Sequence, residues 1–367
     1  MLPALKKFTS FLGRMLKIFI LSSTAAFGVI TTIILLLIFF IAGMSGLSTA
    51  REATQAEHLG QTLEFGKKDA KNTLLAVPIT GLILGDKASA DSLSTLFTSG
   101  VTYGYEIKKE LRAAADKNEV AGVILMIDSP GGTIFGSQAI SDGVTYYKEK
   151  TGKPVFAYVG GVAASGAYWA AVSADTIIAD HGTVTGSIGV IFGPFKYYDK
   201  VLSEDGGAFV GGVVTQGGIE STYITAGKSK DVGNPYRKLT DFEITRLQQS
   251  VNDSYDEFVT QVSSHRKIAP EVIKEELGAL IYGEAQAMKY KLIDSVGSKE
   301  DAFAALAARA GVAEGEYKVE RLSGKQDFFS TLISSASKVG APQAVTSACL
   351  LHSQVLAFHG DLMSVCP

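Results

Sequence analysis

The sequence predicts an α/β fold in which strands and helices alternate and form a mainly parallel sheet covered by helices. The first observation is a series of uninterrupted apolar runs of strand length, each followed by a segment with helical spacing. The second is composition, since 46% of the residues are hydrophobic and 39 are glycine, which fits a globular protein with many tight turns. A third observation, an uncharged apolar run near the start, predicts one transmembrane helix in front of this fold.

The apolar run at residues 18–44 is predicted to be an uncleaved membrane anchor. It contains the letters IILLLIFFIAG and exceeds the roughly 20 residues that a helix needs to cross a bilayer. Lys6, Lys7, Arg14 and Lys17 precede it, and charges of both signs follow it. Basic flanks stay cytoplasmic, so we expect residues 1–17 inside and the rest of the chain outside. The alternative is a secretory signal cleaved before Arg51, but the apolar core of such a signal is only about 7–15 residues long.

The elements that follow the anchor justify the fold class in order. Residues 45–72 are polar and are predicted to form a juxtamembrane linker. The alternation then predicts a strand at 74–84, a loop at 88–100, a helix at 105–117, a strand at 120–128, a helix at 135–150, a strand at 154–160, a helix at 164–173 and strands at 175–180 and 182–191. A short strand at 221–225, a long amphipathic helix at 239–267 and helices at 269–277, 285–292 and 299–309 complete one domain over residues 73–324. Residues 325–367 lose the alternation and form a weakly structured or helical appendage to which the sequence assigns no role.

Two glycine-containing motifs follow predicted strands and are candidate site elements. The first, DSPGG at 128–132, ends a buried strand, and its backbone N–H groups could stabilise an oxyanion. An ordinary turn is the alternative. The second, GGVAASGAYWAA at 160–171, puts Ser165 at a strand-to-helix junction, where free amides favour developing negative charge. A helix N-cap is the alternative for this serine.

The residues that could activate Ser165 are few. No GxSxG elbow surrounds it, which disfavours an α/β-hydrolase. Of the five histidines only His181 is a plausible base, and its context DHGT is more typical of a turn. A neutral lysine amine is the remaining activator, and TAGKSKDVGNPYR at 225–237 offers Lys228 and Lys230. Most lysines are surface charges, and spacing does not choose between these two.

The order of four short motifs resembles one known family. SPGG, then AASG, then TGSIGV, then GKSKD with a following proline is similar to the signal peptide peptidase A family of Ser–Lys peptidases, in a short single-unit form, across about residues 74–310. This resemblance implies a fold related to the Clp protease and crotonase superfamily, with residues 73–324 as the peptidase domain. It also implies an enzyme anchored at the outer face of the bacterial cytoplasmic membrane that degrades signal peptides left in the bilayer, and it implies no metal or cofactor.

The resemblance also assigns roles to single residues. It makes Ser165 the nucleophile, Gly132 an oxyanion-hole donor with Gly166 beside it, and Ser187 the residue that orients the lysine. Lys230 fits the family's general base better than Lys228, because an acidic residue and then a proline follow it. A lysine accepts a proton only when neutral, and an apolar site favours that form. The glycine-rich stretch between Ser187 and Lys230 is longer than the family pattern.

The expected partners are hydrophobic peptide substrates, the membrane and further copies of the chain. The resemblance suggests a ring of several copies, in which serine and lysine could come from different subunits. A net charge of −3 provides no footprint for nucleic acid. Two other functions remain open, a crotonase-like acyl-CoA enzyme and a non-catalytic membrane scaffold or chaperone. Cys349 and Cys366, both in the appendage, could form a disulfide or remain thiols.

Overall fold

The computed structural model describes residues 60–86, 100–195, 197, 224, 226–323 and 356–358, all within one compact unit that begins at Leu59. The predicted anchor at 18–44, both cysteines and nearly all of the predicted strand at 221–225 lie outside these residues. Among the described helices, none combines the length and the apolar character that a membrane span requires.

The described strands form one sheet in which the central strands are parallel. Its path runs β1 (Gly60–Gly66), β10 (Tyr317–Ser323), β2 (Asn72–Leu84), β4 (Val120–Thr133), β5 (Val155–Ala164), β6 (Thr176–Ala179) and β9 (Ser295–Val296). Off this path, β3 (Val101–Tyr103) pairs with β2, β7 (Val184–Gly186) with β5, β8 (Ile281–Gly283) with β7, and β11 (Leu356–Phe358) with β4. Only the pairs β1–β10, β7–β8 and β4–β11 are antiparallel among the described strands. The predicted α/β class is therefore confirmed.

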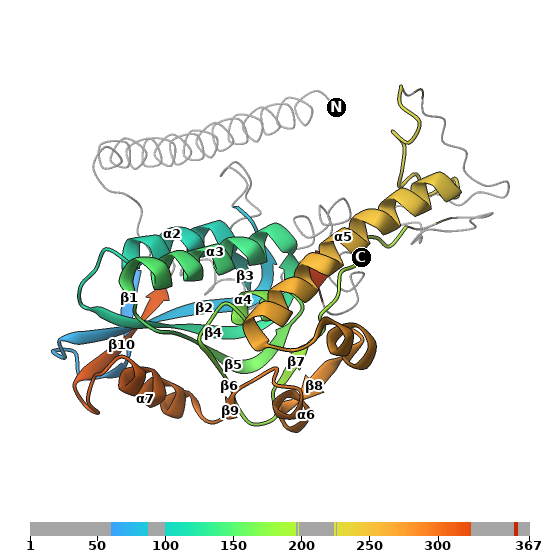
Figure 1. Ribbon diagram of the computed structural model, residues 1–367. Coiled ribbons are helices and arrows are strands. Elements are labelled where there is room, and N and C mark those ends of the chain that lie inside the picture. Colours follow the sequence, from blue (N-terminus) through green and yellow to red (C-terminus); the bar gives the residue numbers. More distant parts are fainter. Residues whose placement is uncertain are drawn as a thin grey trace, which may run out of the picture. The chain divides into compact units, whose positions relative to one another are not determined.

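Helices cover both faces of the sheet (Figure 1). One face carries α2 (Gly104–Ala114), α3 (Ile134–Thr151), α4 (Gly166–Ala171) and part of α5 (Asp241–Arg266), and the other carries α7 (Lys299–Arg309). A π-helical turn (Val272–Leu277) and α6 (Glu284–Lys289) follow α5. The connections β4–α3–β5 and β5–α4–β6 are the repeated βαβ units that the alternation predicts.

Strand β2 shows why its sequence lacks a polar face. Leu75, Val77 and Ile79 pack into the core under α2 to α5, whereas Leu74 and Ala76 pack against α7 on the other face. All five side chains are at most 1% exposed. A parallel strand buried on both faces requires such a continuous apolar run.

The structure departs from the predicted boundaries where tertiary pairing decides. Residues 60–66, within the predicted linker, form β1, and Phe65 packs its ring 5.8 Å from that of Phe303. The predicted strand at 182–191 contributes only β7, and the predicted helix at 269–277 is the π-helical turn. Strand β4 continues through the DSPGG motif to Thr133 because β2 still pairs with it there. Within the predicted appendage, residues 356–358 form β11.

Candidate functional site

Ser165 lies at the junction between β5 and α4. Its backbone adopts φ 55° and ψ −119°, a region that residues with side chains rarely occupy, and the residue is fully buried. Two hydrogen bonds hold this geometry: its N–H donates to the Gly186 carbonyl at 2.8 Å, and its carbonyl accepts the N–H of Trp169 at 2.9 Å. The chain therefore turns sharply at this one serine.

The segment after β7 wraps around Ser165. Strand β7 pairs with the end of β5 through Ala164 and Gly186, and the Ser165 hydroxyl lies 3.4 Å from the Gly189 carbonyl. Ser187, between these two glycines, also has a positive φ, 50°, and its N–H donates to the Leu280 carbonyl at 2.7 Å. The structure thus brings Ser165 and Ser187 into one neighbourhood.

Gly132 lies in β4, where the backbone of β2 approaches closely. A Cβ at this position would meet the Ile83 carbonyl oxygen at 2.0 Å, so only glycine fits here. Strand β4 is in register with β5 as far as Ser129 opposite Ala163, two residues before Ser165. The segments that carry Gly132 and Ser165 therefore leave neighbouring strands at the same end of the sheet, and Gly166 follows Ser165 as the first residue of α4.

Two residues of the DSPGG motif have structural roles that the sequence analysis missed. The fully buried Ser129 donates to the Gly81 carbonyl at 2.6 Å and accepts the N–H of Gly131 at 3.1 Å. Asp128 accepts the N–H of Val162 at 3.1 Å, which links β4 to β5 through a side chain. A serine two residues before a glycine is a known turn signal, and it could have indicated the first role.

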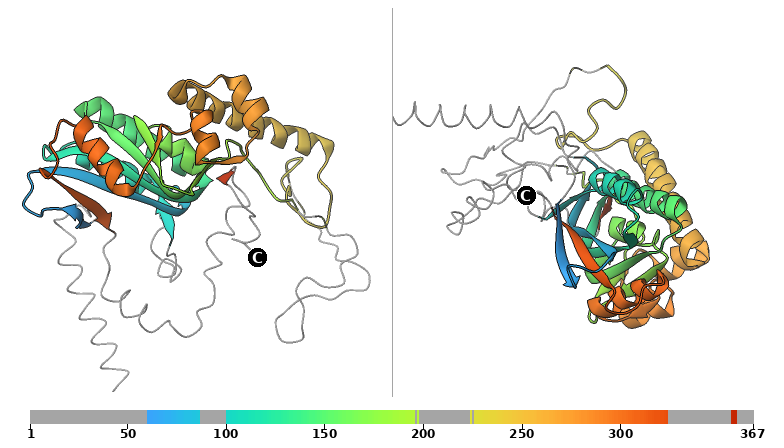
Figure 2. Two further views of the ribbon diagram at one scale, coloured as in Figure 1. Left: turned by 90° about the horizontal axis from the view of Figure 1, so that it is seen from below. Right: turned by 90° about the vertical axis from the view of Figure 1, so that its left-hand side faces the viewer.

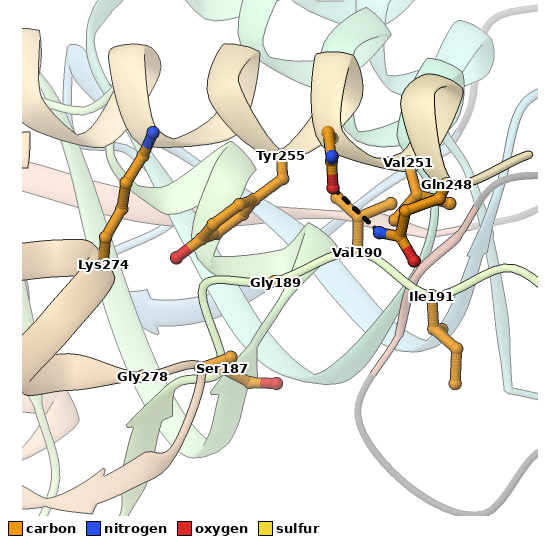
Figure 3. Close-up of a pocket in the computed structure, with 11 residues that line it drawn as sticks. Ser187, Gly189, Val190, Ile191, Gln248, Val251, Tyr255, Lys274 and Gly278 are labelled. Atoms are coloured by element: carbon orange, nitrogen blue, oxygen red, sulfur yellow. Dashed lines mark hydrogen bonds between the residues drawn. The ribbon is translucent and has the colours of Figure 1, made fainter. Parts of the chain in front are cut away.

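A pocket of about 460 Å³ extends from Ser187 along α5 (Figure 3). Its lining residues come from the segment after β7, from α5 and from the region of the π-helical turn: Ser187, Gly189, Val190, Ile191, Gln248, Val251, Asn252, Tyr255, Lys274, Gly278 and Ala279. Lys274 is a lysine that the sequence analysis did not consider. Its amine donates to Asp256 at 2.6 Å, and this carboxylate raises its pKa, which favours the ammonium form and makes Lys274 a poor base.

Lys230 belongs to the segment that leads into α5. Arg237 joins Asp231 to Glu243 of the first turn of α5 through hydrogen bonds of 2.7 to 2.9 Å, so residues 231–243 form one cluster at the start of that helix. Lys228 lies in the same region, with its amine 4.2 Å from the centre of the Phe242 ring.

The start of α5 lies far along the helix from Ser165. Phe258, fifteen residues after Glu243, packs its ring 4.7 Å from that of Trp169 in α4. Fifteen residues correspond to about 22 Å of helix axis. Figure 1 shows the segment before α5 (yellow) at the outer end of this helix, away from α4. Within one chain, the structure does not bring Lys230 to Ser165.

His181, the alternative base, lies in the exposed turn before β7. Its side chain is 76% exposed, and its ring nitrogen lies 3.8 Å from Glu284. Within the described ranges, no cluster of three or more His, Cys, Asp and Glu side chains is placed to hold a metal ion.

Comparison with curated proteins shows relatives among proteases. A candidate protease of Methanocaldococcus jannaschii is 36% identical over 54% of this chain and 59% of its own length. A candidate signal peptide peptidase SppA of Enterococcus faecium is 29% identical over 67% of this chain and 65% of its own length. The chain thus spans about three fifths of the length of these two relatives. A candidate protease of Synechocystis is 32% identical over 59% of this chain and 72% of its own length.

A solved structure and a family model complete the comparison. The 1510-N membrane-bound stomatin-specific protease in complex with a substrate peptide aligns with a TM-score of 0.39 and 17% identity, covering 74% of this chain and all of that chain. The model of peptidase family S49 matches residues 147–313, a range that includes Ser165, Ser187 and Lys230. Together with the Synechocystis relative, this match shows that the chain belongs to peptidase family S49.

Proposed function

We propose that this chain is a membrane-anchored serine endopeptidase in which Ser165 is the nucleophile and Lys230 the general base. The observation that carries the proposal is the backbone of Ser165, a buried serine held at a positive φ where two strands meet a helix. Strained backbone of this kind concentrates at functional sites because the surrounding structure must impose it. Membership of a peptidase family supports the same reaction class.

The chemistry follows from the residues around Ser165. The neutral amine of Lys230 takes the hydroxyl proton while the Ser165 oxygen attacks the scissile carbonyl carbon, which gives a tetrahedral oxyanion. Backbone N–H groups of Gly132 and Gly166 would stabilise that oxyanion. As the C–N bond breaks, the proton passes to the leaving amine, and water then hydrolyses the acyl ester to release the second product and free Ser165. Ser187, beside Ser165, would orient the amine.

The position of Lys230 favours a base supplied by a second copy of the chain. The segment that carries it lies at the outer end of α5, about 22 Å along the helix from the part that contacts α4. Apolar side chains are exposed both near that end and beside Ser187: Phe242 and Ile244 are 44% and 50% exposed, and Leu280 and Ile281 are 63% and 40% exposed. Exposed apolar groups on two different surfaces suit a head-to-tail contact between copies.

The proposed substrates are hydrophobic peptides, such as remnant signal peptides, at the outer face of the cytoplasmic membrane. The basic residues before the apolar run at 18–44 support this orientation. A reporter enzyme fused after His58 should be active only outside the cytoplasm, and reporter activity inside would contradict the proposed localisation.

Labelling with a fluorophosphonate tests the nucleophile. We expect a fluorophosphonate probe to modify the wild-type protein at one serine and to leave Ser165→Ala unmodified. Ser173→Ala is the matched control, because Ser173 is also buried and its hydroxyl donates to a helix carbonyl, that of Ala170, outside the site. Modification of a different serine would contradict the choice of Ser165 as the nucleophile. No modification of a folded wild-type protein would contradict the proposal and favour an acyl-CoA enzyme or a scaffold.

A further inference from the structure

A second pocket, of about 270 Å³, lies at the end of β5 opposite to Ser165. Its lining comes from the end of α3, the segments before β5 and β6, and the end of α7: Lys148, Gly152, Lys153, Pro154, Asp175 and Arg309. Strand β5 begins directly after Pro154, and its ten residues end directly before Ser165. Ten residues of strand span about 30 Å, so this pocket is separate from the candidate active site.

Elements from both faces of the sheet meet at this pocket. Figure 2 (right) shows α3 (green) and α7 (orange) on opposite sides of the strands. Gly122 in β4 lets α7 come close, because a Cβ at this position would meet the Leu306 side chain at 3.0 Å and the Pro154 carbonyl oxygen at 3.2 Å. The end of α7 therefore lies beside the segment before β5, and the space between them has room for a small anion.

The charges around the pocket are unequal. Three positive side chains and one carboxylate line it, which gives the lining a net charge of +2. Asp175 lies 2.6 Å from the Lys148 amine and accepts the N–H of Val155 at 2.9 Å, so its negative charge is offset within the fold. Lys153 and Arg309 have no carboxylate partner among the residues that the structure describes.

Both lysine amines are held in position by backbone carbonyls. The Lys153 amine donates to the Asn118 carbonyl at 3.1 Å and to the Val120 carbonyl at 2.5 Å. The Lys148 amine donates to the Ser173 carbonyl at 3.1 Å, in addition to its ion pair. An ammonium group has three N–H donors, so each lysine keeps one that no residue of the described ranges accepts.

Helix ends explain only two of the three cations. Lys148 lies in the last turn of α3 and Arg309 in the last turn of α7, where a cation offsets the partial negative charge of the helix terminus. Lys153 lies after Gly152, the C-cap of α3, and its amine is bonded to β4 and the segment before it instead of to a helix. The gathering of three cations around one pocket therefore needs a further reason.

We propose that this pocket binds a phosphate group, carried either by free phosphate or by the headgroup of a lipid. A phosphate monoester has a charge of about −1.5 to −2 at pH 7, which matches the net charge of +2 of the lining. The guanidinium of Arg309 suits two phosphate oxygens at once, and each lysine adds a fixed point charge. The bound group joins α3, the start of β5 and α7 and so stabilises the folded protein. This inference does not rest on the proposed function.

Thermal unfolding of the full-length protein in detergent tests the site. Phosphate replaces chloride at constant ionic strength, and the fluorescence of Trp169, the only tryptophan, follows unfolding. At a phosphate concentration about a hundred times Kd, the Tm of the wild type should rise by roughly 5–10 °C, because the site exists only in the folded protein. Lys153→Met and Arg309→Met should lose most of this rise.

Lys150→Met is the matched control. Lys150 also lies in the last turn of α3, but its amine pairs with Asp116 and it does not line the pocket. This variant should keep the wild-type rise in Tm. Calorimetric titration with phosphate measures the affinity directly, and in Arg309→Met it should fall about tenfold or more, as expected for the loss of a hydrogen bond to a charged group.

A short-chain phosphatidic acid distinguishes the two sources of the phosphate group. If it binds at the pocket and displaces phosphate, a lipid headgroup fits the site. If phosphate binds and the lipid does not, free phosphate is the ligand. Either result supports the proposal when Arg309→Met weakens the binding.

Three results would overturn the proposal. The first is the absence of any rise in Tm of the wild type with both probes. The second is an equal rise in the wild type, Lys153→Met and Arg309→Met, which would show a general effect of salt. The third is an unchanged phosphate affinity in Arg309→Met, a variant that should fold normally because Arg309 is exposed and loses no hydrogen bond or ion pair to the described residues.

Discussion

Ser165 holds its unusual backbone because both of its main-chain polar groups are engaged. Its N–H is bonded to Gly186 of β7, and its carbonyl accepts the N–H of Trp169 in α4. A backbone in such a region costs about 1–3 kcal/mol and persists only where its neighbours impose it. Relaxing Ser165 would break either the contact with β7 or the first turn of α4. The direction of its hydroxyl is thus set by the fold and not by a neighbouring charge.

The two lysines before α5 allow a test at the scale of single residues. Lys230→Met should reduce kcat by about 10²- to 10⁴-fold, the contribution typical of a general base. Lys230→Arg should be equally inactive, because a guanidinium does not release its proton near neutral pH. Steady-state cleavage of a hydrophobic peptide measures both effects, and circular dichroism checks folding.

Lys228→Met is the matched control for this test. Lys228 lies over the Phe242 ring, an exposed contact worth about 0.5–1 kcal/mol, so its loss should leave kcat near the wild-type value. If Lys228→Met were inactive and Lys230→Met active, the choice of base would be wrong. If only His181→Ala removed activity, the Ser–Lys mechanism would be wrong.

At the scale of elements, the sequence predicts strands best where they are buried on both faces. Leu74 to Ile79 in β2 and Val123 to Ile127 in β4 form continuous apolar runs, which are typical of central parallel strands. The edge strand β1 and its neighbour β10 have no such run, since GQTLEFG and YKVERLS mix charged and apolar residues. Their pairing depends on partners more than 200 residues apart, which local patterns do not contain.

The candidate site also contains parts that local sequence patterns indicate and parts that they do not. Gly132 lies within β4, Ser165 directly follows β5 and Ser187 directly follows β7, so the motifs that contain them lie at strand ends that local patterns can indicate. The position of Lys230 depends on the direction of α5, and no local pattern specifies where a 26-residue helix projects from the core. The pairing of β11 with β4 was missed for a similar reason, because three apolar residues in a tail carry no strand periodicity.

The start of α5 is held by an acid-sensitive network. Arg237 and the N–H of Thr240 lower the pKa of Glu243 from 4.5 to about 2, and the Glu243 side chain is only 2% exposed. A carboxyl group whose pKa is lower in the folded protein than in the unfolded chain stabilises the fold at pH values above its unfolded pKa. This stability is lost as the pH falls towards the folded pKa. The segment that carries Lys230 should therefore loosen as pH falls from about 4.5 to about 2.

Glu243→Gln tests this network, with Glu257→Gln as the control at an exposed position of the same helix. Trp169 is the only tryptophan of the chain and packs on Phe258 of α5, so its fluorescence follows unfolding in urea. The wild type and Glu257→Gln should lose stability progressively between pH 4.5 and 2.5. Glu243→Gln should start less stable and show a shallower loss over that range. Parallel pH profiles for all three proteins would contradict the assignment.

At the scale of the whole molecule, the position of α5 supports the proposal that a second copy of the chain supplies the base. A single copy presents Ser165 beside the core and Lys230 at the far end of an extended helix. A head-to-tail contact repeated around a ring would place the outer end of α5 of each copy beside Ser187 of the next copy. Under this proposal, the active unit is the contact between two copies and not a single chain.

Complementation between two inactive variants tests this arrangement. Ser165→Ala keeps Lys230, and Lys230→Met keeps Ser165, so each pure protein should be inactive. In assemblies formed by co-expressing equal amounts of both, about a quarter of the contacts between copies should join an intact serine to an intact lysine. Peptide cleavage should therefore return to about a quarter of the wild-type rate.

Co-expression of Ser165→Ala with the double variant Ser165→Ala/Lys230→Met is the matched control, and it should remain inactive because no copy retains the nucleophile. Two different affinity tags, one on each variant, ensure that the assayed assemblies contain both chains. Two results would show that serine and lysine meet within one chain. One is a mixed assembly without activity, and the other is a wild-type protein that cleaves peptide although light scattering shows it to be a monomer. In either case α5 would have to bend to bring the two residues together.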